Sequence, residues 1–251
     1  MRIGLHLGGS LDRSIPAFYE KAKPGIGIIQ VLFNSPQRYW PASRFADQAI
    51  MLKISEFMKK EDVKVVVHAP YVFTLNQPDK TRKALERHLA YCDGLGIETL
   101  VVHSGTWRDP LLNNPVDDWV RFLEPFVDRY RSMVLLENMA YKEGAMTDQE
   151  LNAVCDRVKC GICLDTAHAW IGRAPMNDLD PRHVKLIHLN QTDSPQGSGR
   201  DRHSQNQLND GLIEMNHLQN TLRRYPHADA VSEYAGPRWR VELDLLWRIK
   251  G

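Results

Sequence analysis

The strongest constraint on the fold is a regular alternation of apolar runs with segments of helical periodicity. Eight short runs recur along the chain: RIGLHL from Arg2, GIGIIQVLF from Gly25, VKVVVHAPY from Val63, TLVVHSG from Thr99, MVLLENMA from Met133, GICLDTAH from Gly161, HVKLIHLN from His183 and ADAVSEY from Ala228. Most are almost continuously apolar, as is typical of strands buried on both faces. Apolar residues with helical spacing fill the intervals, for example in 43–60, 79–96 and 116–132. This pattern predicts one (β/α)8 TIM barrel, with 1–251 forming a single domain.

The alternative architecture is a doubly wound open sheet, and two segments depart from a regular barrel. An open sheet of that kind usually has a glycine-rich phosphate loop after its first strand, and LGGSLDRS is only a weak match. Residues 169–182, AWIGRAPMNDLDPR, are rich in Pro, Gly and Asp, so we expect the helix after the sixth strand to be shortened or replaced by a loop. Residues 191–211 form a long polar stretch, and loops of this length are usually functional or disordered.

Composition excludes several classes of protein. Lys and Arg total 32 against 31 Asp and Glu, and 43% of residues are apolar, which excludes a disordered chain. No apolar run approaches the roughly 18 residues of a membrane helix, and MRIGLHLGGS lacks the features of a signal peptide. We therefore expect a cytoplasmic monomer with no membrane partner. The net charge of +1 means that any nucleic-acid contact must use a local basic patch. Cys160 and Cys163 form a CxxC without a second pair, which favours buried thiols over a redox or zinc motif.

Ionisable residues follow the apolar runs at the ends of most predicted strands. They are His68, His103, Glu137, Asp165, His168, His188 and Glu233, and the long loop adds Asp201 and His203. Each one alone could be a hydrogen-bonded rim histidine or a helix cap. In a barrel, however, all the carboxyl ends of the strands open onto one face, so the nine side chains converge. Four carboxylates in one pocket of low dielectric repel each other unless a cation neutralises them.

The mixture of imidazole and carboxylate ligands suits Zn²⁺, Mn²⁺ or Fe²⁺ better than Ca²⁺. Nine ligands are too many for one tetrahedral ion, whereas three ions with three or four ligands each, sharing one carboxylate, would use them all. Metal clusters of this kind serve the cleavage of phosphate esters.

At this point the sequence resembles the endonuclease IV family of apurinic/apyrimidinic endonucleases, within the xylose-isomerase-like barrels. The resemblance runs over nearly the whole chain and is carried by LFNSPQRYW, HAPYVFTLNQPD, VVHSGTW, LLENMA, GICLDTAHA, IHLNQTDSPQGSGRDRH and SEY. It implies cleavage of double-stranded DNA 5′ to abasic sites, leaving a 3′-hydroxyl and a 5′ deoxyribose phosphate.

The resemblance also implies three zinc ions, with manganese or iron as alternatives at some positions. The first would be held by His68, His103 and Glu137. The second would take Glu137 as a bridge, completed by Asp165, His188 and Glu233. The third would be held by His168, Asp201 and His203. Catalysis would then depend on Glu137, Asp165 and Glu233.

Contacts with DNA are implied at Arg38, which matches an arginine inserted near the lesion, and at Tyr71 and Val72, which match a Tyr-Leu pair that enters the DNA. We add Arg200 and Arg202 from the long loop as phosphate contacts. Three departures from the family pattern affect these expectations: the chain is shorter than typical members, SQNQLNDGL has less glycine than usual, and Val72 is a smaller wedge than leucine.

Two other functions use the same barrel. A sugar isomerase or epimerase would hold a single metal through Glu137, Asp165, His188 and Glu233, but would leave His68, His103, Asp201 and His203 without an ion. A binding protein that had lost activity would not need to retain carboxylates that are costly to bury. Metal stoichiometry separates the three hypotheses.

Overall fold

The structure is a computed structural model that describes residues 1–8, 12–23, 25–105, 114–140, 146–172, 178–202, 206–234 and 236–251. Its strands are β1 (Ile3–His6), β2 (Ile28–Leu32), β3 (Lys64–His68), β4 (Thr99–His103), β5 (Met133–Glu137), β6 (Gly161–Asp165), β7 (Val184–His188) and β8 (Asp229–Ser232). They pair in parallel in chain order, and β8 returns to pair with β1, so the sheet closes into a barrel. The predicted (β/α)8 architecture is confirmed.

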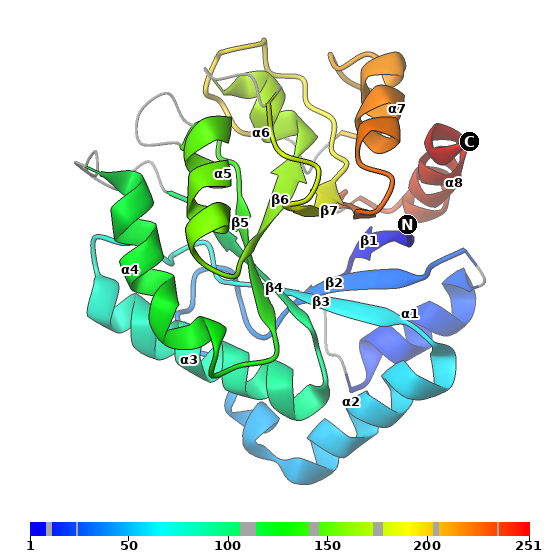
Figure 1. The fold of residues 1–251 in the computed structure, drawn as a ribbon. Helices are drawn as coiled ribbons and strands as arrows, with labels where there is room; N and C mark the ends of the chain where they lie inside the picture. The colour runs from blue at the N-terminus through cyan, green and yellow to red at the C-terminus, as the bar shows by residue number, and fades with distance from the viewer. Residues whose placement is uncertain are drawn as a thin grey trace.

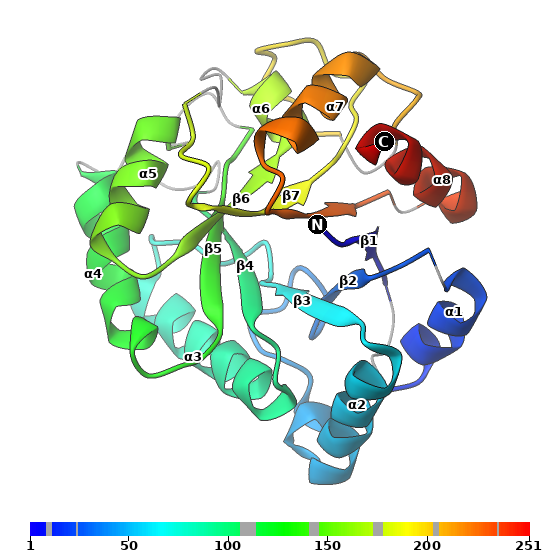
Figure 2. The same cartoon turned by 45° about the vertical axis from the view of Figure 1, so that its right-hand side comes forward.

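Helices surround this barrel in chain order (Figures 1 and 2). They are α1 (Ser14–Ala22), α2 (Gln48–Glu61), α3 (Pro78–Leu95), α4 (Pro115–Val127), α5 (Asp148–Arg157), α6 (Thr166–Ile171), α7 (Met215–Arg224) and α8 (Trp239–Lys250), and a 3-10 turn, η1 (Ser43–Ala46), precedes α2. Helix α3 begins at a proline and is capped at its C-terminus by Gly96, whose φ of 72° is left-handed. Helix α6 has only 6 residues, so the expected shortening is confirmed, while 173–177 lie outside the described residues.

The interior of the barrel is filled by one buried residue from each of seven strands. This inner layer consists of Ile28, Val66, Val101, Leu135, Cys163, Leu186 and Val231. On β1 the matching position is Gly4, where an added Cβ would lie only 1.6 Å from the carbonyl oxygen of Ile28. A glycine is therefore required there for β1 to approach β2. The layer forms an apolar floor beneath the carboxyl ends of the strands.

A second and larger core lies between the barrel and the helices. It includes Cys160, whose Sγ lies 2.8 Å from that of Cys155 on α5, whereas Cys163 points into the barrel. All four cysteines are free and buried, in agreement with the prediction of buried thiols. Among the described residues, we find no helix with the length and apolar character that a membrane span requires.

Candidate metal centre

Directly above the apolar floor lies a ring of polar side chains, one from each strand or its end. Each ring residue follows a floor residue or Gly4 by two positions: His6, Gln30, His68, His103, Glu137, Asp165, His188 and Glu233. Because side chains at i and i+2 of a strand point to the same side, a strand that contributes to the floor also contributes to the ring. The barrel thus brings together residues separated by more than 200 positions in the chain.

Glu137 lies at the centre of this ring. Its Oε2 is 3.0 Å from Nε2 of His68 and 3.5 Å from Nε2 of His103. Its Oε1 is 3.2 Å from Nδ1 of His168 and 3.3 Å from Nδ1 of His188. Each carboxylate oxygen therefore faces two imidazoles, and Glu137 itself is 1% exposed. This is the geometry of a carboxylate shared between two neighbouring sites.

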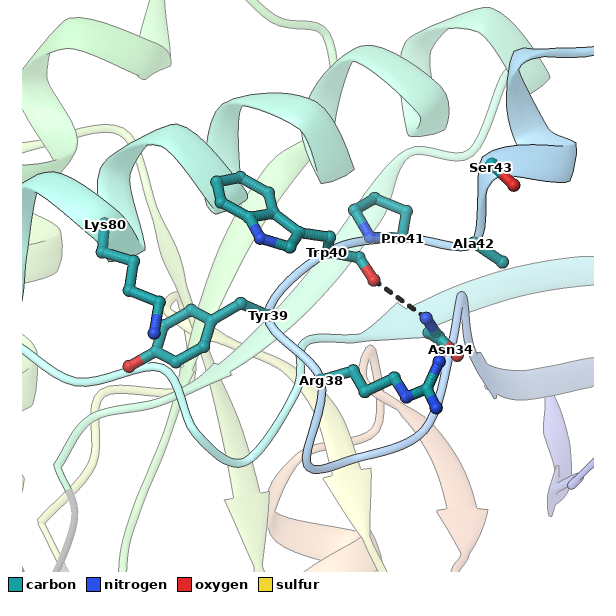
Figure 3. Close-up of a pocket in the computed structure, with 8 residues that line it drawn as sticks. All are labelled: Asn34, Arg38, Tyr39, Trp40, Pro41, Ala42, Ser43 and Lys80. Carbon is teal, nitrogen blue, oxygen red and sulfur yellow. Dashed lines mark hydrogen bonds between the residues drawn. The ribbon is translucent and has the colours of Figure 1, made fainter.

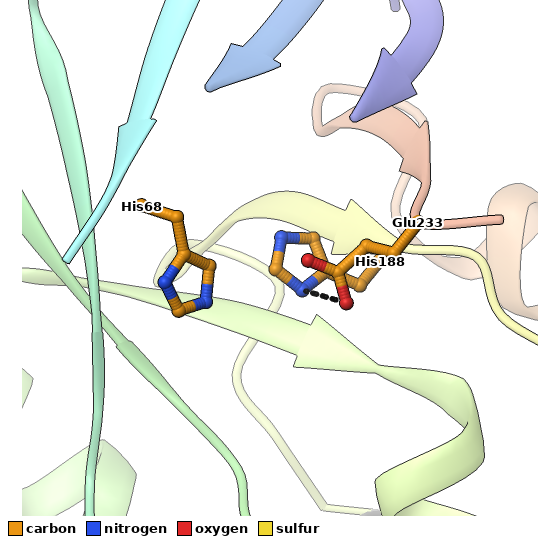
Figure 4. A group of neighbouring side chains, drawn as sticks. All are labelled: His68, His188 and Glu233. Carbon is orange, nitrogen blue, oxygen red and sulfur yellow. Dashed lines mark ion pairs between the residues drawn. The ribbon is translucent and has the colours of Figure 1, made fainter. Parts of the chain in front are cut away.

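Three groups of side chains in the described part of the chain have donor atoms that all lie within 4.8 Å of one another. They are His68, His188 and Glu233; His68, His103 and Glu137; and Glu137, Asp165, His188 and Glu233. Figure 4 shows the first group, in which Nδ1 of His188 lies 3.6 Å from Oε2 of Glu233. The predicted first and second ligand sets are thus brought together. Their mixed nitrogen and oxygen donors fit Zn²⁺ or a similar transition-metal ion.

Part of the predicted third set lies beside this cluster. Nε2 of His168 is 3.2 Å from Oδ2 of Asp201, while His203 lies outside the described residues. His168 is placed by α6, whose first turn is capped by Asp165: its Oδ1 accepts a hydrogen bond from the His168 backbone N–H at 2.7 Å. One carboxylate therefore caps the helix through one oxygen and faces the cluster through the other.

Asparagine side chains hold the carboxylates in place. Nδ2 of Asn190 donates to Oδ2 of Asp165 at 2.6 Å and to Oε2 of Glu233 at 3.2 Å. Its Oδ1 accepts the backbone N–H of Glu233 at 2.9 Å, which fixes the chain beyond β8. Asn138 exchanges two hydrogen bonds with the backbone of Asp165, at 2.7 and 3.1 Å. Outer-shell bonds of this kind orient metal ligands.

Gln30 bridges two members of the ring from β2. Its Nε2 donates to Oε1 of Glu233 at 2.7 Å, and its Oε1 lies 2.7 Å from Nε2 of His188. The amide oxygen can only accept, so Nε2 of His188 carries the proton of this bond. This leaves Nδ1 of His188 directed at the carboxylates, where a cation would be held.

Electrostatics shows that the cluster needs positive charge. Burial alone would raise the pKa of Glu137, but His188 and His103 hold that pKa well below its ordinary value. Burial opposes protonation of His168, yet Asp165 and Asp201 raise the pKa of that imidazole well above its ordinary value. The buried carboxylates therefore draw a cation into their midst, either a proton on histidine or a metal ion.

His103 behaves differently from His168, because burial lowers the pKa of His103 to about 3. Its imidazole is therefore neutral at pH 7 and offers a lone pair to a cation. A buried set of carboxylates, together with an available imidazole lone pair, fits a metal centre.

Comparison with known proteins identifies the family. The model of the xylose isomerase-like TIM barrel family matches residues 18–247, which is most of the chain. The chain belongs to this family.

Individual proteins of known name are also similar to the chain over most of its length. The chain is 28% identical over 240 residues to a curated protein of Aquifex aeolicus (strain VF5) named probable endonuclease 4, covering 84% of this chain and 83% of the relative. Among solved structures it matches endonuclease IV from Thermus thermophilus, with a TM-score of 0.78, 23% identity and coverage of 99% and 100%. It also matches a D-tagatose 3-epimerase-like protein, with a TM-score of 0.71, 18% identity and coverage of 99% and 96%. The resemblance to endonuclease IV that the motifs indicate is confirmed.

The residues predicted to contact DNA lie on loops of this xylose isomerase-like barrel that follow the strands. Tyr71 is 42% exposed, and its ring stacks on His103 with centroids 5.0 Å apart and an interplanar angle of 11°. Val72 beside it is half-buried, and Arg38, Arg200 and Arg202 are exposed. Tyr71 therefore touches the metal centre as well as the solvent. Burial and the carboxylates of the cluster raise the pKa of Tyr71, so its phenol is protonated at neutral pH.

Sequence reasoning missed two members of the ring of this barrel. Gln30 lies inside the run GIGIIQVLF, which reads as a strand buried on both faces. The signal that could have found it is its spacing of two from Ile28, the same spacing that separates His68 from Val66. His6 lies near the end of the first run, where the sequence predicts nothing more than a hydrogen bond within the core. The structure does place its Nδ1 3.3 Å from Oε1 of Glu233, but this partner is a member of the ring.

Proposed function

We propose that this protein is a metal-dependent DNA repair endonuclease that hydrolyses the phosphodiester 5′ to abasic sites, leaving a 3′-hydroxyl. We further propose three zinc ions as its cofactor, with manganese or iron as alternatives at some positions. The observation that supports this most strongly is the position of Glu137 between two pairs of histidines, with two donor groups sharing its carboxylate. A site for a single ion has no use for so many buried ligands. The curated relative named probable endonuclease 4 supports the same reaction.

Ligand roles follow the sets expected from the sequence. We assign His68, His103 and Glu137 to the first ion. Glu137 also belongs to the second ion, together with Asp165, His188 and Glu233. We assign His168, Asp201 and His203 to the third. Bound metal ions supply hydroxide at neutral pH and stabilise the attacking and leaving oxygens of a phosphate ester.

The chain's own residues fix the geometry in which that chemistry occurs. We propose that Glu137, Asp165 and Glu233 are the catalytic carboxylates. Asn190 joins two of them, so a change in one position is transmitted to the other. Buried and held by fixed hydrogen bonds, these groups need little reorganisation when charge develops on the phosphate.

DNA would reach this centre from the loop side, where the predicted contacts lie. An abasic nucleotide has lost its stacking, so turning it out of the duplex costs less than for an intact one. We assign Arg38, Tyr71 and Val72 to the vacated space and Arg200 and Arg202 to phosphates. In the described part of the chain, neither Arg200 nor Arg202 has a carboxylate within ion-pair distance, which leaves both free for an anion.

A duplex carrying one abasic site tests the proposal. Purified protein should cut it 5′ to the lesion, and a chelator should abolish the cut until zinc is restored. Metal analysis of protein purified without chelator should give more than two transition-metal ions per chain. A consistent value of one, without cleavage, would refute the proposed function.

The second candidate is a single-metal sugar isomerase or epimerase. It is favoured by one observation: Glu137, Asp165, His188 and Glu233 form a complete four-ligand group by themselves. Turnover of a ketose with one ion per chain would establish this alternative. We also propose that the protein is a cytoplasmic monomer. The four free cysteines support the cytoplasmic location, because thiols persist in a reducing compartment.

A further inference from the structure

A separate cavity lies in the loop that follows β2, outside the metal centre. It has a volume of about 560 Å³ and is lined by Asn34, Arg38, Tyr39, Trp40, Pro41, Ala42, Ser43 and Lys80 (Figure 3). Small-molecule sites typically have volumes of roughly 300–1,000 Å³. The lining holds two cations, two aromatic rings, a hydroxyl and an amide, but no acidic side chain. Its chemistry therefore suits an anion.

Aromatic rings of the cavity hold Lys80, which lines it, and Arg87, which lies beside it, in place. Nζ of Lys80, on α3, lies 3.9 Å from the ring centroid of Tyr39. The guanidinium of Arg87, two turns further along α3, lies 4.6 Å from the ring centroid of Trp40. Tyr39 is itself braced by Phe73, with centroids 5.8 Å apart. Cations fixed in this way lose less side-chain entropy when they bind a ligand.

These cations have no acidic partners within the described ranges. Arg38, Lys80 and Arg87 each lack a carboxylate within ion-pair distance, whereas Arg129 nearby pairs with Glu86. Their charge is therefore not neutralised by the protein. The net charge of the chain is only +1, so these side chains form a local basic patch on a protein that is nearly neutral as a whole.

The cavity is tied to the loop that borders the metal centre. Trp40 accepts a hydrogen bond at its carbonyl from Nδ2 of Asn34 at 3.1 Å, which closes the loop on itself. The carbonyl of Pro36 in the same loop accepts the backbone N–H of Tyr71 at 2.9 Å. Tyr71 in turn stacks on His103. A polyanion lying across the metal centre thus meets this cavity along the same rim.

We propose that this cavity binds a phosphodiester of DNA that flanks the one to be cleaved. Lys80 and Arg87 neutralise that phosphate, and Trp40, which is 38% exposed, contacts the adjoining sugar or base. Bases commonly stack on aromatic side chains in nucleic-acid complexes, whatever their sequence. This inference rests on the proposed function and adds to it a site for a flanking phosphate, next to the residue, Arg38, that we assign to the lesion.

The test compares a Lys80→Ala, Arg87→Ala double variant with wild type in binding to abasic duplex. Binding by the variant should be weaker by roughly tenfold at moderate salt, and the log–log salt slope should fall by about 0.9 for the phosphate lost. Lys21→Ala is the matched control, because Lys21 is an exposed lysine at the end of α1 that leads into β2, away from the carboxyl ends of the strands. Thermal unfolding and metal content verify that the variants are folded and loaded.

A second measurement locates the phosphate. Uncharged methylphosphonate linkages are placed one at a time along the duplex on both sides of the abasic site. For wild type, one flanking position should weaken binding, and for the double variant the same substitution should have no further effect. Fully additive losses at every position, or an unchanged salt slope, would overturn the inference. If wild type cuts abasic duplex in the same experiment, the proposed function stands even when this inference fails.

Discussion

Replacing Gln30 by methionine removes a bridge between two proposed metal ligands while keeping an unbranched side chain of similar length. The amide of Gln30 makes bonds of 2.7 Å to both Glu233 and His188, and it is fully buried. Without that amide, the buried Nε2 of His188 loses its oxygen acceptor, and the orientation of the imidazole is no longer fixed. Loss of such outer-shell partners typically costs about 10–100-fold in metal affinity. That range corresponds to about 1.4–2.7 kcal/mol.

The assay is competition for zinc with a chelator of known affinity, combined with thermal unfolding of the metal-free protein. Gln30→Met should release its most weakly held ion at a chelator concentration about 10–100-fold lower than wild type. Metal-free Gln30→Met should also unfold more easily, because an unsatisfied buried polar group costs about 1–3 kcal/mol. Gln207→Met is the control, since Gln207 is also buried but, within the described ranges, its side chain donates only to the carbonyl of Arg238, at 3.4 Å. A zinc affinity of Gln30→Met within twofold of wild type would refute the bridging role.

Three further predictions concern other parts of the molecule. Glu137→Ala should lose two metal ions per chain and His103→Ala at most one, because Glu137 faces both histidine pairs; equal metal contents by elemental analysis would count against a shared carboxylate. Tyr71→Ala should weaken binding of abasic duplex by roughly ten- to a hundredfold, whereas Tyr71→Phe should retain most of the wild-type affinity, since the aromatic ring makes the stacking contact. Similar losses of affinity in titrations of both variants would show that the ring is not what binds the duplex. Burial lowers the pKa of His88 from 6.5 to about 4, so the neutral form stabilises the fold above pH 6.5 and this contribution is lost as pH falls towards 4. Between pH 6.5 and pH 4, the free energy of unfolding measured with denaturant should therefore fall by about 3 kcal/mol more for wild type than for His88→Leu. Parallel pH profiles of the two proteins would contradict the assignment.

The strand ends and their chemistry could be predicted from the sequence because each ligand interrupts an apolar run. Closure of the barrel then follows from the count and alternation of the runs, and closure is what makes the ligands converge. Gln30 could not be found in that way, since a single amide among eight apolar or small residues carries no sign of which face of the strand it occupies. Its role depends on side chains of β7 and the end of β8, more than 150 positions away.

The bonds of Asn138 and Asn190 are likewise a product of tertiary structure. Each asparagine follows a ligand position by one or two residues, but its partner lies on another strand or at its end.

The cysteines show the converse, a sequence motif whose two members do not meet in the structure. CxxC spacing draws attention to Cys160 and Cys163, yet an odd spacing along a strand directs the two side chains to opposite faces. Cys160 therefore meets Cys155 of α5, and Cys163 belongs to the floor of the barrel.

The order of the ligands along the barrel has a consequence for assembly of the molecule. His68, His103 and Glu137 come from β3, β4 and β5, which are consecutive in the chain and adjacent in the sheet, so this group needs no contact between the two ends of the polypeptide. The four-ligand group also requires Glu233, whose position depends on β8 having joined β1. An ion in the first group would organise half of a nascent barrel, whereas an ion in the second would bind only to the closed form and stabilise closure by mass action. Metal loading at the four-ligand group would therefore be coupled to closure of the barrel, whereas loading at the group of His68, His103 and Glu137 would not depend on closure.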